Sequence, residues 1–171
     1  MKKLSLKLSD IFKLLSFAVL MSIFLNSCGS SEKLNDQQVA ELISSKEFEI
    51  ENDWAMPMRA GNINLIGNPN FIRFQTDSVS IFLPYFGVRQ TGGGYGNANG
   101  IEYEGPVKNL KISENVNSAY RQIQFEGNNG TENLKFSILI FENGKTNTNV
   151  TSSQRDAISY RGRISHLPET E

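Results

Sequence analysis

Apolar and polar side chains alternate along the chain from Glu47 onward, and this alternation predicts a mainly β protein. In the first segment acidic residues alternate with Phe48, Ile50, Trp54, Met56 and Met58. A period of two is typical of a strand with one buried face and one solvent-exposed face. Pro57 has no N–H to donate, so this strand is expected to lie at an edge, to bulge or to end there.

Short apolar or alternating runs continue toward the C-terminus, with brief turns between them. They cover residues 62–66, 71–75, 79–82, 102–112, 120–126, 134–141, 145–151 and 158–164. Strands joined by short turns usually pair antiparallel with their neighbours. The clearest turn is Glu142-Asn143-Gly144-Lys145, because Asn-Gly tolerates the positive φ angles of a type I′ turn. We expect a single antiparallel domain of about eight strands over residues 36–165, a barrel-like sheet or a sandwich. A loose tail, residues 166–171, is expected to follow it.

One short helix is expected before the first strand, at residues 36–45. Asn35 stands where it can cap this helix, and Gln38 follows three residues later, which is the spacing of a capping box. The apolar residues that then fall on one helical face are Val39, Leu42 and Ile43. The helix is expected to lie against the sheet by this narrow stripe.

The first 27 residues have the order of a secretory signal peptide. Four lysines precede a short apolar run, residues 14–25, which falls short of the ~20 residues that a membrane-spanning helix needs. Leu25-Asn26-Ser27-Cys28 resembles the lipobox of bacterial lipoproteins, in which the cysteine carries the lipid and becomes the first residue after cleavage. We therefore expect lipidation of Cys28, a polar tether over residues 28–35, and a place in the cell envelope on the outer or inner membrane, periplasmic or surface-exposed.

Composition narrows the range of partners. Four of the 17 basic residues and one of the 18 acidic residues lie in the leader, so the remaining chain has a net charge of −4. A mildly acidic surface has no counterion-release drive toward nucleic acid. Cys28 is the single cysteine, which excludes an internal disulfide. The expected partners are the membrane, reached through the lipid, and an envelope protein, a glycan or a small apolar ligand.

The stretch from Ser78 to Pro106 is the least ordinary part of the sequence. An apolar run ends in Leu83-Pro84-Tyr85-Phe86-Gly87, and a segment rich in glycine and asparagine follows. Its glycines do not fit G-x-G-x-x-G and no Walker lysine follows, so no nucleotide site is expected. We interpret the stretch as strand, long loop and strand, with Tyr85, Phe86 and Tyr95 at a rim where aromatic rings stack on sugars or anchor a partner. The alternative is that Tyr85 and Phe86 fill the core at a strand end.

No catalytic or metal-binding constellation is visible, and no cofactor is expected. His166 is the only histidine and follows the last predicted strand, whereas a Ser-His-Asp or Cys-His device needs a histidine held by packing. The acidic residues of the first strand stand ~7 Å apart along one face, too far to share a cation. Glu102 and Glu104 are the carboxylates to examine for glycoside hydrolysis, although the exposed face of an alternating strand also explains them.

Three groups of residues together carry a family resemblance. They are Ala55-Met56-Pro57-Met58-Arg59 with Ile63-Asn64-Leu65; Asp77-Ser78-Val79 with Leu83-Pro84-Tyr85-Phe86-Gly87; and Ile158-Ser159-Tyr160-Arg161-Gly162-Arg163-Ile164. With them the chain resembles, from about Phe48 to Ile164, the Bacteroidota lipoprotein family catalogued as domain of unknown function 4251. The resemblance implies a lipoprotein of the Gram-negative cell envelope. It transfers no catalytic residue, because the family has no assigned activity.

Three functions remain open at this point. A non-catalytic binding or structural module tethered by a lipidated cysteine accounts for the anchor, the β-rich domain and the aromatic rim, and this is the main hypothesis. A barrel of ~8 strands is also able to carry one small apolar ligand, as lipocalins do, provided that its interior is open. A hydrolase acting on glycans requires two carboxylates ~5–10 Å apart across a concave surface. The chain is not expected to be an enzyme.

Overall fold

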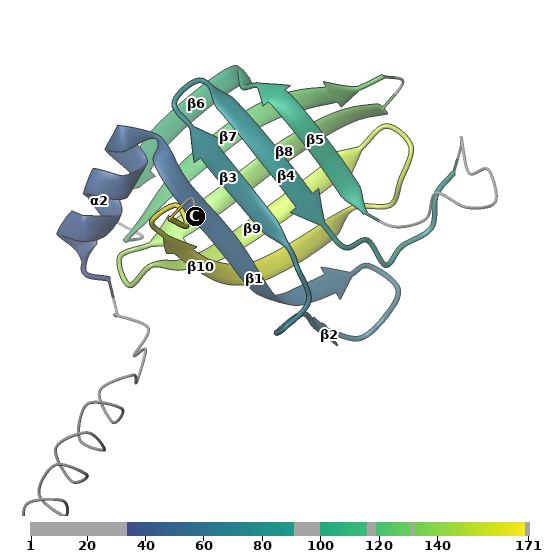
Figure 1. The fold of residues 1–171 in the computed structure, drawn as a ribbon. Coiled ribbons are helices and arrows are strands. Elements are labelled where there is room, and N and C mark those ends of the chain that lie inside the picture. The colour runs from purple at the N-terminus through teal and green to yellow at the C-terminus, as the bar shows by residue number, and fades with distance from the viewer. Residues whose placement is uncertain (1–33, 91–99, 116–118, 131, 170–171) are drawn as a thin grey trace, which may run out of the picture. The chain divides into compact units, whose positions relative to one another are not determined.

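The computed structural model describes residues 34–90, 100–115, 119–130 and 132–169. This part of the chain forms one helix, α2 (Asp36–Ser45), and one antiparallel sheet of ten strands (Figure 1). The strands are β1 (Glu47–Pro57), β2 (Ile63–Asn64), β3 (Phe71–Gln75), β4 (Ser78–Leu83), β5 (Ile101–Pro106), β6 (Lys108–Asn115), β7 (Tyr120–Asn129), β8 (Glu132–Phe141), β9 (Lys145–Ser152) and β10 (Ile158–Ser165).

The sheet curls into a nearly closed barrel, so the predicted mainly β, antiparallel domain is confirmed, and of the two predicted forms the barrel-like one is correct. Its strand order is β5-β4-β3-β1-β10-β9-β8-β7-β6, with β2 paired to β1 beside this path. At the seam Asn129 of β7 donates a hydrogen bond of 2.9 Å to the carbonyl of Glu102 in β5. Gly127 makes room there for the ring of Tyr103. The nine predicted runs, of which 62–66 shortens to the two-residue β2, become ten strands because the run 102–112 divides into β5 and β6.

The helix has the predicted bounds and packs by the predicted stripe. Asn35 accepts a hydrogen bond from the N–H of Gln38 at 3.0 Å, and the Gln38 side chain accepts one from the N–H of Asn35 at 2.9 Å. Its apolar residues Val39, Leu42 and Ile43 are buried in the barrel core. Asp36 also pairs with Arg121 of β7 at 2.5 Å. With these contacts α2 lies across one end of the barrel (Figure 1).

Four phenylalanine rings meet in the barrel interior. Phe48 stacks on Phe74 and Phe125 stacks on Phe136, each pair with ring centroids 4.7 Å apart. Phe74 meets Phe125 edge-on at 5.3 Å. Since β3 and β7 are not neighbours in the sheet, this last contact crosses the interior. These rings occupy the middle of the space in which a lipocalin-like barrel holds its ligand.

β1 bulges in its middle, and the bulge reverses which side chains face the core. Its register with β10 shifts between Asn52 and Trp54. Before the shift Phe48 is buried as predicted, whereas after it Trp54 is 39% exposed. The expectation that Trp54, Met56 and Met58 share the buried face of Phe48 is therefore wrong.

Gly162 of β10 supplies the physical reason for this bulge. It pairs with Asn52, and a Cβ at position 162 would lie 2.0 Å from the carbonyl oxygen of Glu51. Only a residue without a side chain lets two backbones approach this closely. The residue that causes the bulge therefore belongs to β10, far along the sequence, and the pattern of β1 alone does not predict the bulge.

The β8–β9 hairpin forms where it was predicted, but its turn is different. The N–H of Gly144 donates to the carbonyl of Phe141 at 2.9 Å. Gly144 has a φ of 75°, and Asn143 is not among the described residues with positive φ. A type I′ turn requires positive φ at both central residues, so that prediction is wrong. The loop is a three-residue connection with glycine in the left-handed conformation.

Several predictions for the N-terminus and the loop fall outside the described residues. These are the signal peptide over residues 1–27, the lipidation of Cys28 and the position of Tyr95. Within the described ranges, no helix combines the length and apolar character that crossing a bilayer demands.

Candidate functional site

Several connections gather at the end of the barrel opposite α2 (Figure 1). β1 and β4 end on this side, and β5 and β10 begin there. We call this side the loop end and define it as residues 58–62, 84–90, Gly100 and 153–157. The other end carries α2 and the β3–β4 and β8–β9 turns. The loop end is therefore where the stretch Ser78–Pro106 leaves and re-enters the sheet.

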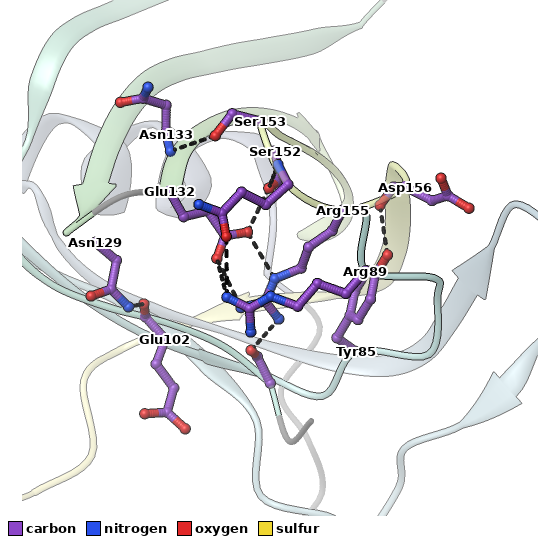
Figure 2. A network of polar contacts seen from close by, with 12 residues as sticks. Tyr85, Arg89, Glu102, Asn129, Glu132, Asn133, Ser152, Ser153, Arg155 and Asp156 are labelled. Atoms are coloured by element: carbon purple, nitrogen blue, oxygen red, sulfur yellow. Dashed lines mark hydrogen bonds and ion pairs between the residues drawn. The ribbon is translucent and has the colours of Figure 1, made fainter. Parts of the chain in front are cut away.

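A buried ion pair lies beneath the loop end. Glu132, the first residue of β8, is 3% exposed, and Arg155 donates to its two carboxylate oxygens at 2.7 and 2.9 Å. The hydroxyl of Ser152 donates at 2.5 Å, and an Arg89 nitrogen lies 3.7 Å away (Figure 2). Arg155 also donates to the carbonyl of Gly100 at 2.5 Å. This Glu132 cluster, made of Glu132, Ser152, Arg155 and Arg89, thus joins β8 and β9 to residues on both sides of positions 91–99.

The surroundings of Glu132 keep it ionised. Burial by itself raises the pKa of the carboxyl, but the hydrogen bonds from Arg155 and Ser152 and the charge of Arg89 outweigh burial, so the pKa of Glu132 lies below its ordinary value. A general acid or base works best with a pKa near the operating pH. The Glu132 cluster therefore has the electrostatics of a structural clamp.

Tyr85 fastens the start of the loop to the β9–β10 connection. Its hydroxyl lies 3.0 Å from the carbonyl oxygen of Val88 and 3.1 Å from that of Asp156, and it shares its one hydrogen between these two acceptors. Figure 2 shows the contact between Tyr85 and Asp156. The Arg155 guanidinium lies 5.2 Å from the centre of the Tyr85 ring, within range of a cation–π contact. Gly87 is needed beside it, because a Cβ at that position would lie 2.3 Å from the Tyr85 hydroxyl oxygen.

The three predicted rim residues do not share one environment. Tyr85 is half-buried and packs against the core, Phe86 is exposed, and Tyr95 lies outside the described residues. Burial, with the carboxylate of Asp156 adding to it, raises the pKa of Tyr85, so its hydroxyl stays a donor at neutral pH. In this arrangement Tyr85 holds the loop and Phe86 is presented by it.

Sequence reasoning predicted Phe86 at this surface but missed Met58 and Val88. The described exposed residues of this kind at the loop end are Met58 (72% exposed), Val88 (52%) and Phe86 (40%). Arg59 pairs with Asp156 at 3.2 Å, and the N–H of Asp156 donates to the carbonyl of Val88 at 3.1 Å. These contacts bring the residue after Met58 close to the backbone of Val88. No local pattern reveals this, because Arg59, Val88 and Asp156 are far apart in the sequence.

The carboxylates considered for glycan hydrolysis do not face each other across a cleft. Glu102 and Glu104 are exposed two residues apart on the outside of β5, where they border a hollow of about 390 Å³. His166 is exposed beyond β10. In the described part of the chain, no group of three or more His, Cys, Asp or Glu side chains is arranged to hold a metal ion.

Comparison with known proteins gives a family and a fold. The family described as Domain of unknown function (DUF4251) matches residues 30–164. The crystal structure of a DUF4251 family protein from Bacteroides eggerthii DSM 20697 is similar, with a TM-score of 0.59 and 10% sequence identity over 77% of this chain and 87% of that chain. At this identity the likeness shows a shared fold. No curated protein matches the chain.

Proposed function

We propose that this chain, which belongs to the DUF4251 family, is a non-catalytic binding module that is tethered to the cell envelope through Cys28 and presents its loop end to a partner protein. The family resemblance predicted from the sequence is confirmed, and the family description names no activity. The proposal therefore depends on the geometry of the barrel and on the sequence before it.

The start of the described domain supports a tether that leaves the loop end accessible. Leu34 lies against Gly144 in the β8–β9 turn, where a Cβ would be 3.3 Å from the leucine Cδ1. This turn is at the helix end of the barrel, opposite the loop end (Figure 1). Cys28 precedes Leu34 by six residues, which extend to at most about 20 Å. The segment that carries Cys28 therefore joins the domain at its helix end.

The observation that carries the proposal is the exposure of Met58, Phe86 and Val88 at one end of the domain. Apolar side chains grouped on a surface favour an interaction site. Methionine adapts to varied partner surfaces, and aliphatic side chains match a protein surface better than a sugar, which stacks on aromatic rings. The Glu132 cluster and Tyr85 hold the backbone that presents them, which lowers the entropy lost on binding.

The tether has its own test in the native host. We expect the wild-type protein to incorporate radiolabelled palmitate and to sediment with membranes, because multiple acyl chains at about 0.8 kcal/mol per buried methylene anchor permanently. The Cys28→Ser variant should lose both properties and keep its fold, judged by circular dichroism. A wild-type protein without label would contradict the anchor and leave the loop-end proposal standing.

The loop end is tested by site-specific photo-crosslinking in the same cells. A photoreactive amino acid at Met58 or Val88 should give a crosslinked adduct of one defined mass, since these side chains would lie in the interface. The same reagent at Ile112 of β6, an exposed apolar residue away from the loop end, is the matched control. The loop-end proposal fails if neither position gives a discrete adduct, or if Ile112 gives the same one.

A further inference from the structure

The outer face of the β6–β10 side carries uncharged polar side chains that the loop-end proposal does not use. The strand register aligns them in two rows that run across the sheet. The first row is Ser159, Asn149, Ser137 and Gln124, and the second is Asn147, Leu139 and Gln122. Alternate residues of the same strands, such as Thr148 and Phe136, are buried. The amides and hydroxyls therefore stand together on the outside of the barrel.

Two adjoining hollows lie over these rows. Their volumes are about 470 and about 420 Å³, within the range of roughly 300–1,000 Å³ that small-molecule sites occupy. Ser137 and Asn149 line both of them. The first reaches Lys111 of β6 and the second reaches Met56 of β1, so together they cross adjacent strands over roughly 24 Å at the usual strand spacing.

The middle of this face offers hydrogen-bonding groups without charge. Gln122 donates to the hydroxyl of Ser137 and Asn149 donates to that of Ser159, each at 3.0 Å. In each pair the amide oxygen and the hydroxyl hydrogen remain available for a ligand. Among the residues that the structure describes, the side chains of Gln124 and Asn147 have no hydrogen-bond partner. Both rows therefore offer hydrogen-bond donors and acceptors.

The charges beside the first hollow largely compensate each other. Lys135 pairs with Glu126 at 3.3 Å, and Asn109 donates to the same carboxylate at 2.7 Å. Lys111, at the β6 side, and Arg161, at the β1 side, stand at opposite ends of the two hollows. The rows between them carry no ionisable group. This distribution does not favour an anionic ligand across the centre of the face.

Two apolar side chains line the second hollow, and an indole stands next to one of its lining residues, Arg161, in the strand register. The bulge in β1 turns Trp54, the single tryptophan, to the outside, beside Arg161 of β10. Met56 and Leu139 line the hollow itself. Tryptophan combines a large apolar face with one N–H donor. In the register the second row therefore continues from Asn147 through Arg161 to the aromatic surface of Trp54.

We propose that this outer face binds a neutral oligosaccharide chain, which lies across the strands from Gln124 to Trp54. Sugar hydroxyls both donate and accept hydrogen bonds, as the amide and hydroxyl side chains of the two rows do. The apolar faces of sugar rings pack on Trp54, Met56 and Leu139. This glycan site consists of the two rows and does not include the loop end. Binding of a glycan is therefore independent of binding of the partner protein.

Other ligand classes match this face less well. A peptide is usually held at a sheet edge or by several apolar anchors, whereas the rows are in the interior of the sheet and contain one leucine. Nucleic acid requires neutralisation of many phosphates, and the two cations at the ends of the hollows are too few for that. A neutral polyhydroxylated ligand uses the groups that are present.

The test is binding of the full chain, purified in a detergent without a sugar head group, to an array of neutral and anionic glycans. We expect binding to at least one neutral glycan, which is then titrated by calorimetry. The double variant Gln124→Ala/Asn149→Ala and the variant Trp54→Ala should each bind about tenfold more weakly, a loss of about 1.4 kcal/mol, because the first loses two hydrogen-bonding side chains and the second loses the aromatic face. Trp54→Phe keeps an aromatic face and should bind more tightly than Trp54→Ala.

The hollow on β4 and β5 provides the matched control. Ser80→Ala/Glu102→Gln changes two polar side chains that line that hollow and should leave glycan affinity unchanged. The inference is overturned if no neutral glycan binds, if only anionic glycans bind, or if the control variant loses affinity equally. The melting temperature of each variant shows whether it is folded, and the photo-crosslinking result does not affect the outcome.

Discussion

Replacing Glu132 by glutamine is expected to lower the free energy of unfolding by about 3–5 kcal/mol. The carboxylate accepts hydrogen bonds from Arg155 and Ser152 and lies 3.7 Å from Arg89. An amide has no charge to offset these guanidinium groups and brings N–H donors against them. Equilibrium unfolding in urea at pH 7 measures the loss. Glu104→Gln on the exposed face of β5 is the matched control, and it should change stability by less than about 0.5 kcal/mol.

Two further measurements separate a buried ion pair from a general loss of packing. The double variant Glu132→Leu/Arg155→Met should be less destabilised than the sum of its single variants, because neither charge is then left unpaired. The pKa of Glu132 is lowered in the folded state, so its stabilisation is present above the ordinary glutamate pKa of about 4.3 and is lost as the pH falls through the folded value. Glu132→Gln should therefore remove part of the acid-induced loss of stability. Additive single effects and an unchanged acid limb would contradict the clamp.

Local features of this fold follow from the sequence, because their causes lie within a few residues. The capping box of Asn35 and Gln38 and the apolar stripe behind it set the bounds of α2 without help from the barrel. The β8–β9 hairpin was also predictable from Gly144. Its turn type was not, because a two-residue and a three-residue loop can both use Asn-Gly, and the strand register decides between them.

The facing of side chains in polar strands depends on partners that the local sequence does not contain. In β9 every second residue is inside, but threonine and asparagine alternate there, so polarity alone does not tell which set is buried. The structure buries Thr146 and Thr148 and leaves Asn149 exposed. In β1 the bulge opposite Gly162 likewise decides that Trp54 faces outward, and the sequence of β1 alone does not indicate it. The outer-face rows become visible only when the register between strands is known.

The residues of the loop end show a further limit of prediction from the sequence. Glu132 and Arg155 stand in polar segments that look like ordinary turns, and Arg89 follows a strand end without any motif. Their meeting depends on the order β10-β9-β8 and on the bridge between Arg89 and Arg155. The aromatic rim was predicted from composition, and the structure divides it into Tyr85, which holds the loop, and Phe86, which the loop presents. Tyr85 is half-buried and Phe86 is exposed, and a sequence pattern does not predict this difference in burial.

Truncation of Phe125 provides the largest contrast between interior and surface, with an expected loss of about 3–5 kcal/mol for Phe125→Ala. Its ring is fully buried and contacts both Phe74 and Phe136, so alanine leaves a cavity where the two sides of the barrel meet. Phe86→Ala removes the same atoms at the exposed loop end and should change stability by less than about 1 kcal/mol.

The comparison is made by urea unfolding of the wild type and both variants under one condition. Tyr85→Ala should fall between them, because it loses the hydrogen bonds to Val88 and Asp156 and only part of a buried ring. Equal losses for Phe86→Ala and Phe125→Ala would place Phe86 in the core and remove it from the partner surface. A small loss for Phe125→Ala would mean that the barrel interior is not tightly packed, and the lipocalin-like carrier would then deserve a direct search by native mass spectrometry.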